Sequence, residues 1–232
     1  KGDEMKLFSK PLELLVLDFD GVVLDLIATY WTILEVTARK MRLPLEPIQQ
    51  YREGHYNGTR RGSPKFSIVV RECWPHLTEA EAMAYYWRFR AEEERIGYPP
   101  VAGSVEAVRW FLERGVRVAI CTMNDRRAIR WKLRTAGIDS AWPIIVCTRE
   151  DAGYEKPDPR ILALIFRKTG ISTKAACYVG DWYADIEVAR SAGVPFIAVL
   201  SGGIPRHAFI REGVSDDHIL GCLADLPKLI TE

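Results

Sequence analysis

LLVLDFDG, residues 14–21, is the most informative segment of this chain. Four consecutive apolar residues indicate a strand that is buried on both faces, as in parallel sheets. Asp18 and Asp20 follow at once, so they are expected at the carboxyl end of that strand. In open α/β sheets this is the edge where ligands bind, and two closely spaced carboxylates suit a divalent cation. The competing interpretation of this segment alone is a strand that ends in an acidic turn.

The chain after residue 103 alternates between helix-like and strand-like segments. The expected strands are residues 115–122, 143–148, 175–181, 195–200 and a short segment near 218–220, and the expected helices are residues 104–114, 125–136, 158–169, 182–192 and 224–231. This alternation is typical of parallel strands joined by right-handed crossover helices. The predicted fold class is therefore α/β, with a Rossmann-like parallel sheet that carries helices on both faces.

Residues 27–97 contain helix-like segments and little that resembles a strand. The segment of residues 78–97 begins with a capping-box pair, Thr78 and Glu81. Because this helical insertion follows the first strand, it is expected to overhang the carboxyl edge of the sheet. The predicted domains are a core of residues 1–26 and 98–232 and a helical cap of residues 27–97.

The composition excludes several classes of partner. A formal net charge of +1 over 232 residues gives no global attraction to nucleic acid or to a membrane surface. No apolar stretch approaches the roughly 18 residues of a membrane-spanning helix, and the first ten residues lack the apolar core of a signal peptide. The five cysteines are scattered, which favours reduced thiols over disulfides or a zinc site. We therefore expect a cytoplasmic protein with no nucleic-acid or membrane partner, and the oligomeric state stays open.

Polar residues follow the other expected strands as well. Thr122 ends the second strand, Lys156 lies beyond the third, and Asp181 and Asp185 follow the fourth. Each has an ordinary structural explanation, such as a turn residue, a solvated loop lysine or a helix N-cap. Their occurrence in order, each at the same end of an expected strand, favours a shared site instead.

Several carboxylates in one crevice repel each other. At 4 Å a pair of like charges costs about 1 kcal/mol in water and about 4 kcal/mol at an effective dielectric constant of 20. A Mg²⁺ ion removes that penalty, and together with the Lys156 ammonium it offsets the repulsion between the carboxylates and a phosphate. The Thr122 hydroxyl can donate to a further phosphate oxygen. This set of residues matches phosphoryl transfer, with one carboxylate as nucleophile and a second as acid and base.

The four segments DFDGV, the strand that ends at Thr122, KPDP and GDWYAD resemble the four motifs of the haloacid dehalogenase superfamily of phosphohydrolases. The resemblance covers residues 12–200 and implies a Rossmann-like core with a helical cap inserted after the first motif. It implies that Asp18 is the nucleophile and forms an aspartyl-phosphate, and that Asp20 is the general acid and base. It also implies Mg²⁺ held by Asp18, the main-chain carbonyl of Asp20 and Asp181, with Asp185 nearby through water, and a phosphoryl group bound by Thr122 and Lys156.

The expected function is a Mg²⁺-dependent phosphatase that acts on a small phosphorylated metabolite, similar to phosphoglycolate phosphatases. Dehalogenating members lack the second aspartate of the first motif, so Asp20 favours phosphatase chemistry. A phosphosugar mutase of the β-phosphoglucomutase type uses the same motifs and is the alternative. A non-catalytic binding protein on this fold is a further alternative, although it predicts the loss of catalytic residues that are all present here.

Candidates for substrate binding lie outside the four motifs. Asn124 follows the second motif, with Met123 intervening where many members have the asparagine directly after the threonine. Residues 51–66 are rich in glycine and positive charge and are expected to form a loop. If the cap closes over the site, Arg60 and Arg61 of this loop are the candidates for contact with an anionic substrate, while a solvated loop without such contacts is the alternative.

Overall fold

The computed structural model describes residues 5–57, 59 and 66–231 of the chain. Its centre is a six-stranded sheet in which every neighbouring pair is parallel. In spatial order the strands are β5 (Ile144–Thr148), β4 (Arg117–Thr122), β3 (Leu14–Leu17), β6 (Ala176–Gly180), β7 (Phe196–Val199) and β8 (Ile219–Leu220). The LLVL segment thus lies in the middle of the sheet, as its continuous apolar run predicts.

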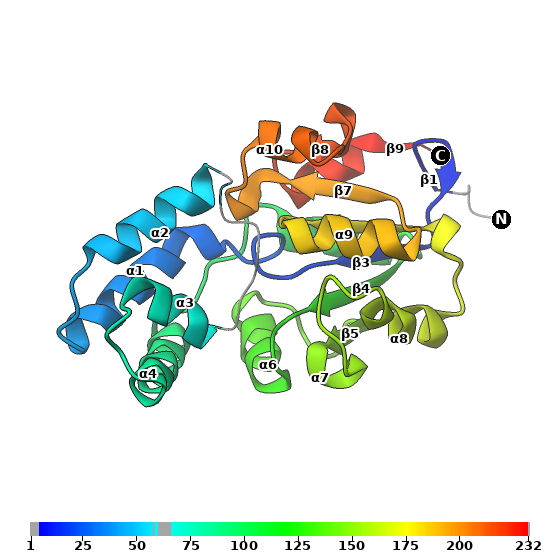
Figure 1. Ribbon diagram of the computed structural model, residues 1–232. Coiled ribbons are helices and arrows are strands. Elements are labelled where there is room, and N and C mark those ends of the chain that lie inside the picture. The colour runs from blue at the N-terminus through cyan, green and yellow to red at the C-terminus, as the bar shows by residue number, and fades with distance from the viewer. Residues whose placement is uncertain (1–4, 58, 60–65, 232) are drawn as a thin grey trace.

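Both faces of the sheet are covered, which confirms the predicted fold class. The helices that lie between the strands along the chain are α5 (Ser104–Glu113), α6 (Arg126–Thr135), α7 (Arg149–Ala152), α8 (Arg160–Thr169), α9 (Tyr183–Ala192) and α10 (Arg206–Arg211) (Figure 1). Leu14 and Val16 of β3 pack in one apolar cluster with α8 and α9, whereas Leu15 and Leu17 pack in another with α5 and α6. Alternate side chains of one strand therefore enter two separate cores.

Helices α1 (Leu26–Lys40), α2 (Glu46–Tyr56), α3 (Phe66–Cys73) and α4 (Glu79–Ile96) form a group beside the sheet, at the left in Figure 1. We call this group the α1–α4 unit. The predicted capping box is present at its last helix, because Thr78 N donates to Glu81 Oε2 at 2.8 Å and Glu81 N donates to Thr78 Oγ1 at 3.3 Å.

The two chain segments that connect this unit to the sheet run side by side. The backbone N–H of Asp25 donates to Pro99 O at 2.8 Å, and that of Val101 donates to Val23 O at 2.9 Å. Leu24 forms a parallel bridge with Asp20 and an antiparallel bridge with Pro100. The connection to the α1–α4 unit therefore begins a few residues after Asp18 and Asp20 along the chain.

Two expected elements were wrong. Residues 51–56, expected as loop, belong to helix α2, in which Tyr51, His55 and Tyr56 make ring contacts with Trp31. The expected terminal helix of residues 224–231 is instead a 3₁₀ helix, Leu223–Leu229, followed by the short strand β9, Ile230–Thr231. Pro227 lies within that segment and has no N–H to donate to an α-helical hydrogen bond.

A second, small sheet was not predicted. Strands β1 (Lys6–Leu7) and β2 (Lys10–Pro11) join β9 in the antiparallel order β2–β1–β9. The five cysteines are free thiols, of which Cys121, Cys147 and Cys177 are buried. Within the described residues, no helix has the length and apolar character needed to cross a membrane.

Candidate active site

The acidic residues of the first and fourth motifs meet at the carboxyl edge of the sheet. Asp18 follows β3 and Asp181 follows β6, and these two strands are neighbours. Asp185 lies in the first turn of α9. One carboxylate oxygen from each of Asp18, Asp181 and Asp185 lies within 4.8 Å of the other two. The structure thus brings together three of the predicted metal-binding side chains.

Lys156 enters the same cluster from the segment between α7 and α8. Its Nζ lies 2.9 Å from Asp18 Oδ2 and 2.7 Å from Asp185 Oδ1. Asp185 is further fixed by the hydroxyl of Tyr178, which donates to Oδ1 at 2.9 Å, and by the backbone N–H of Trp182, which donates to Oδ2 at 3.0 Å. Lys156 therefore links the acids that follow β3 and β6.

Asp181 is buried, yet no hydrogen-bond donor among the described residues reaches its carboxylate. Gly21 and Gly202 leave room for the Asp181 carboxylate, since a Cβ atom added to either residue would collide with it. Gly21 also has a φ of +80°, which favours glycine. A buried carboxylate without a donor is stabilised either by a proton or by a nearby cation, which offsets its desolvation.

The charges of the cluster fit a divalent metal ion. When all groups are ionised, three carboxylates and one ammonium group leave a net charge of −2. Carboxylate oxygens are also the ligands that Mg²⁺ prefers. The donor set therefore suits Mg²⁺.

The electrostatic effects inside the cluster are large. Burial, followed by the nearby Asp185 and Asp20 carboxylates, raises the pKa of Asp18 from 3.8 to about 7, against the opposing effect of Lys156. Burial and the Asp18 carboxylate likewise raise the pKa of Asp181. Burial alone would lower the pKa of Lys156, but the Asp18 and Asp185 carboxylates raise it, so the ammonium form persists. The raised pKa values of Asp18 and Asp181 show that negative charge is crowded in this cluster, so the cluster favours a bound cation.

Thr122, the last residue of β4, forms a compact group with Asn124 and Asp20. The backbone N–H and the side-chain amide of Asn124 both donate to Thr122 Oγ1, at 3.1 and 2.8 Å. The same Asn124 Nδ2 donates to Asp20 Oδ2 at 2.7 Å. Since the hydroxyl oxygen already accepts two hydrogen bonds, the Thr122 O–H remains available to donate to a ligand.

One charged residue in contact with this group, Lys132, and its acidic partner, Glu93, were not predicted. Lys132 of α6 is 2% exposed, and its Nζ donates to Asp20 Oδ1 at 2.9 Å and to Oδ2 at 3.0 Å. It also lies 3.3 Å from Oε1 of Glu93, a buried residue of α4. The signal in the sequence was a lysine on the apolar stripe of a helix, between Ile129 and Ala136.

The substrate-binding candidates differ in outcome. Asn124 contacts Thr122 and Asp20, whereas Arg60 and Arg61 fall outside the described residues. His55 of α2, which belongs to the same predicted loop, reaches the sheet. Its Nε2 is 3.2 Å from Gly202 O, and its ring stacks on Trp182 with a centroid separation of 4.8 Å. The α1–α4 unit therefore contacts the loops that surround Asp181.

Comparisons with known proteins agree with this geometry. Residues 12–193 match the family model of haloacid dehalogenase-like hydrolases. A phosphoglycolate phosphatase from Mesorhizobium japonicum is 33% identical over 113 residues, which is 49% of this chain and 48% of that relative. The phosphoglycolate phosphatase of Agrobacterium fabrum is 28% identical over 235 residues, 97% of each chain. The crystal structure of a HAD-superfamily hydrolase of subfamily IA from Geobacter sulfurreducens has a TM-score of 0.69 and 21% identity, and covers 94% of this chain and 96% of that one.

The family match spans most of the chain and includes all four acidic, hydroxyl and lysine motifs that converge at the sheet edge. The full-length similarity to a phosphatase and the shared fold point in the same direction. The chain belongs to the haloacid dehalogenase-like hydrolases.

Proposed function

We propose that the protein is a Mg²⁺-dependent phosphatase that hydrolyses a small phosphorylated metabolite through an aspartyl-phosphate on Asp18. The observation that carries this proposal is the cluster of Asp18, Asp181 and Asp185 with Lys156 between two of its members. Such a site combines a nucleophile, a place for a divalent cation and a fixed positive charge, which are the parts that phosphoryl transfer requires.

The residues that would hold Mg²⁺ are Asp18, Asp181 and the main-chain carbonyl of Asp20, with Asp185 nearby. Bound there, the ion would neutralise part of the negative charge on the phosphoryl oxygens. The chain itself supplies a second positive charge in the Lys156 ammonium group. The Thr122 hydroxyl supplies a hydrogen-bond donor, because both of its acceptor positions are taken by Asn124.

In the first chemical step, a carboxylate oxygen of Asp18 attacks the phosphorus atom. The bond between phosphorus and the ester oxygen breaks, and the Asp20 carboxyl group gives its proton to the departing alkoxide. The products of this step are the free alcohol and the aspartyl-phosphate.

In the second step, a water molecule attacks the phosphorus atom and gives a proton to the Asp20 carboxylate. The bond between the Asp18 oxygen and phosphorus breaks. Inorganic phosphate leaves, and both aspartates return to their starting states. Asp20 therefore acts as acid in one half of the cycle and as base in the other.

We further propose that residues 27–97, which contain all of the α1–α4 unit except its first residue, Leu26, form a cap that selects the substrate. His55 supports this role, since it bridges from α2 to Gly202 and Trp182 beside the acidic cluster. Arg60 and Arg61 remain candidates on the basis of sequence alone. Closure of a cap would exclude water and strengthen the electrostatic interactions below it.

Phosphoglycolate is the first substrate to test, because relatives over the full chain length are phosphoglycolate phosphatases. The test is a screen of phosphorylated metabolites with Mg²⁺, in which released inorganic phosphate is measured. We expect Mg²⁺-dependent release that EDTA abolishes and added Mg²⁺ restores. Absence of phosphate release from every phosphomonoester would contradict the proposal. Retention of phosphate on a bisphosphate substrate would identify the mutase alternative.

A further inference from the structure

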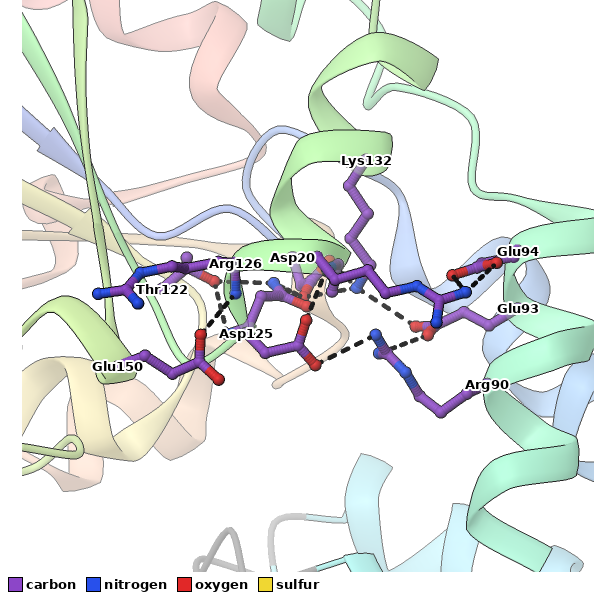
Figure 2. A network of polar contacts seen from close by, with 12 residues as sticks. Asp20, Arg90, Glu93, Glu94, Thr122, Asp125, Arg126, Lys132 and Glu150 are labelled. Atoms are coloured by element: carbon purple, nitrogen blue, oxygen red, sulfur yellow. Dashed lines mark hydrogen bonds and ion pairs between the residues drawn. The ribbon is translucent and has the colours of Figure 1, made fainter. Parts of the chain in front are cut away.

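Lys132 of helix α6 is a buried cation between two acids from different parts of the fold. Its Nζ lies within hydrogen-bond distance of both oxygens of Asp20, at 2.9 and 3.0 Å, and 3.3 Å from Glu93 Oε1 of helix α4. Figure 2 shows the lysine side chain reaching from α6 to the point where the two carboxylates approach. A lysine this deeply buried is stable only when its charge is paired.

Glu93 is itself held in place on the α4 side. Arg90 Nη1 donates to its Oε2 at 2.7 Å, and the Tyr98 hydroxyl donates to its Oε1 at 2.9 Å. Arg90 also reaches across to Asp125 Oδ2 at 3.4 Å. Because Asp125 caps the N-terminus of α6 through Ala128 N, the two helices are joined at two adjacent points (Figure 2).

Asp20 has little orientational freedom in this arrangement. Lys132 contacts both of its carboxylate oxygens, and Asn124 Nδ2 donates to one of them at 2.7 Å. Asn124 fixes the carboxylate from the β4 side, whereas Lys132 fixes it from α6. Lys132 also forms an ion pair with Glu93 of α4, so the position of the Lys132 ammonium group depends on where α4 lies.

We propose that Lys132 is a positioning residue that orients the Asp20 carboxyl group, and that it does so fully only while Glu93 of the α1–α4 unit is docked against it. This inference rests on the proposed function, in which Asp20 exchanges a proton with the leaving alcohol and with water. Proton transfer is thereby coupled to the position of the unit that selects the substrate. Lys132 does not touch the reacting atoms and acts through Asp20.

A simple tether between α4 and α6 is the competing role for Lys132, and the chain offers a matched comparison. Arg127 of α6 pairs with Glu94 of α4 at 2.9 Å, so it joins the same two helices. Its side chain is 79% exposed, and it has no contact with Asp20 among the described interactions. Loss of a tether alone would therefore make Arg127 and Lys132 variants alike.

The experiment compares two substrates with different leaving groups. Phenolate is far more basic than p-nitrophenolate, so cleavage of phenyl phosphate needs proton donation by Asp20 much more than cleavage of p-nitrophenyl phosphate does. The ratio kcat/KM reports events up to the departure of the leaving group. We expect Lys132→Met to lower kcat/KM for phenyl phosphate by about 10²-fold and to change the value for p-nitrophenyl phosphate much less.

Further variants separate positioning from other effects. Lys132→Arg keeps the positive charge and should restore part of the phenyl phosphate activity. Glu93→Gln should lower kcat/KM for phenyl phosphate in the same direction, by about 10-fold. Two controls should retain wild-type selectivity between the substrates: Arg127→Met, and Glu92→Gln, whose carboxylate pairs with Lys40 and Arg95 within the α1–α4 unit.

The possible outcomes distinguish this inference from the proposed function. Equal losses on both substrates, or equal behaviour of Lys132→Met and Arg127→Met, would overturn the positioning role. Unchanged kinetics in Glu93→Gln would overturn the coupling to α4, and this variant decides the question if Lys132→Met does not fold. A wild-type protein without phosphatase activity would overturn the proposed function together with this inference, whereas an active wild type with an unchanged Lys132→Met variant would overturn only the inference.

Discussion

Lys156 Nζ lies 2.9 Å from Asp18 Oδ2, so the positive charge of the third motif directly faces the proposed nucleophile of the first. The same ammonium group is 2.7 Å from Asp185, and both sides of this contact are almost fully enclosed, with 4% exposure for the lysine side chain and 0% for that of Asp185.

Replacement of Lys156 should lower the free energy of unfolding of the protein. Lys156→Met leaves two acids without their shared cation, and loss of one partner from a buried ion pair costs about 3–5 kcal/mol. Denaturant unfolding in EDTA should therefore show a lower free energy of unfolding. Lys228→Met removes an exposed ion pair with Asp225 and should change that free energy by less than about 1 kcal/mol. Equal effects of the two variants would contradict the buried-pair argument.

Replacement of the nucleophile should abolish turnover without loss of the fold. Asp18→Asn puts a neutral amide in place of the attacking carboxylate, and loss of a nucleophile lowers kcat by roughly 10³-fold or more. Phosphate release with Mg²⁺ present is the measurement. Asp216→Asn, which removes an exposed partner of Arg206, is the control and should retain full activity. Normal turnover by Asp18→Asn would remove Asp18 from its proposed role.

The stability of the metal-free protein should fall as the pH rises from about 4 to about 7 through the titration of Asp18. Its pKa is 3.8 before burial and about 7 in the folded protein. Between these values the folded state keeps a proton that the unfolded chain has lost, so the contribution to stability declines as the pH increases. Denaturant unfolding in EDTA across this range measures the effect. The Asp18→Asn variant should lose this part of the pH dependence, and an identical profile in the variant would refute the assignment.

Mg²⁺ should stabilise the protein more at about pH 8 than at about pH 5, because the ion requires ionised carboxylates. The pKa values of Asp18 and Asp181 are both raised in the metal-free state, so protons compete with the ion at lower pH. At a concentration of 100 times Kd, a bound ion adds about 2.7 kcal/mol to the free energy of unfolding. Thermal unfolding with Mg²⁺ and with EDTA at both pH values tests this, and a pH-independent Mg²⁺ effect would count against these two ligands.

The absence of a side chain at Gly202 should be needed for metal binding, because Asp181 occupies the adjacent space. The Cβ atom of Gly202→Ala would collide with the Asp181 carboxylate and displace it, so Mg²⁺ affinity should fall. Titration calorimetry measures that affinity. Gly115→Ala provides the comparison, because Gly115 has a φ of +80° but open space around it. That variant should lose stability through backbone strain while Mg²⁺ affinity stays the same; weaker binding in both would point to a general loss of structure.

The arrangement of the sheet was predictable because its signals are local and strong. The LLVL run of β3 predicts where Asp18 lies, and the same argument applies to Thr122 and Asp181 at the ends of β4 and β6. Parallel strands bring their carboxyl ends to one edge, so order along the chain was enough to predict convergence.

Other features depend on contacts between distant segments. Helix α2 continues through Gly54 and His55, despite their loop-like composition, because this part packs on the ring of Trp31. Lys132 and Glu93 come from two different helices, α6 and α4, so only the folded structure shows that they are buried against each other. The strands β1, β2 and β9 are two residues each, too short for any periodic pattern to be recognised.

The paired connecting segments have a mechanical consequence. Leu24 is bridged on one side to Asp20 and on the other to Pro100, and the neighbouring hydrogen bonds hold the outgoing and returning chains together as a narrow ribbon. Two chains joined in this way resist independent sliding, so we expect any movement of the α1–α4 unit to bend both segments together. Because Leu24 is bridged to Asp20, we expect such bending to act on the backbone of the proposed proton donor.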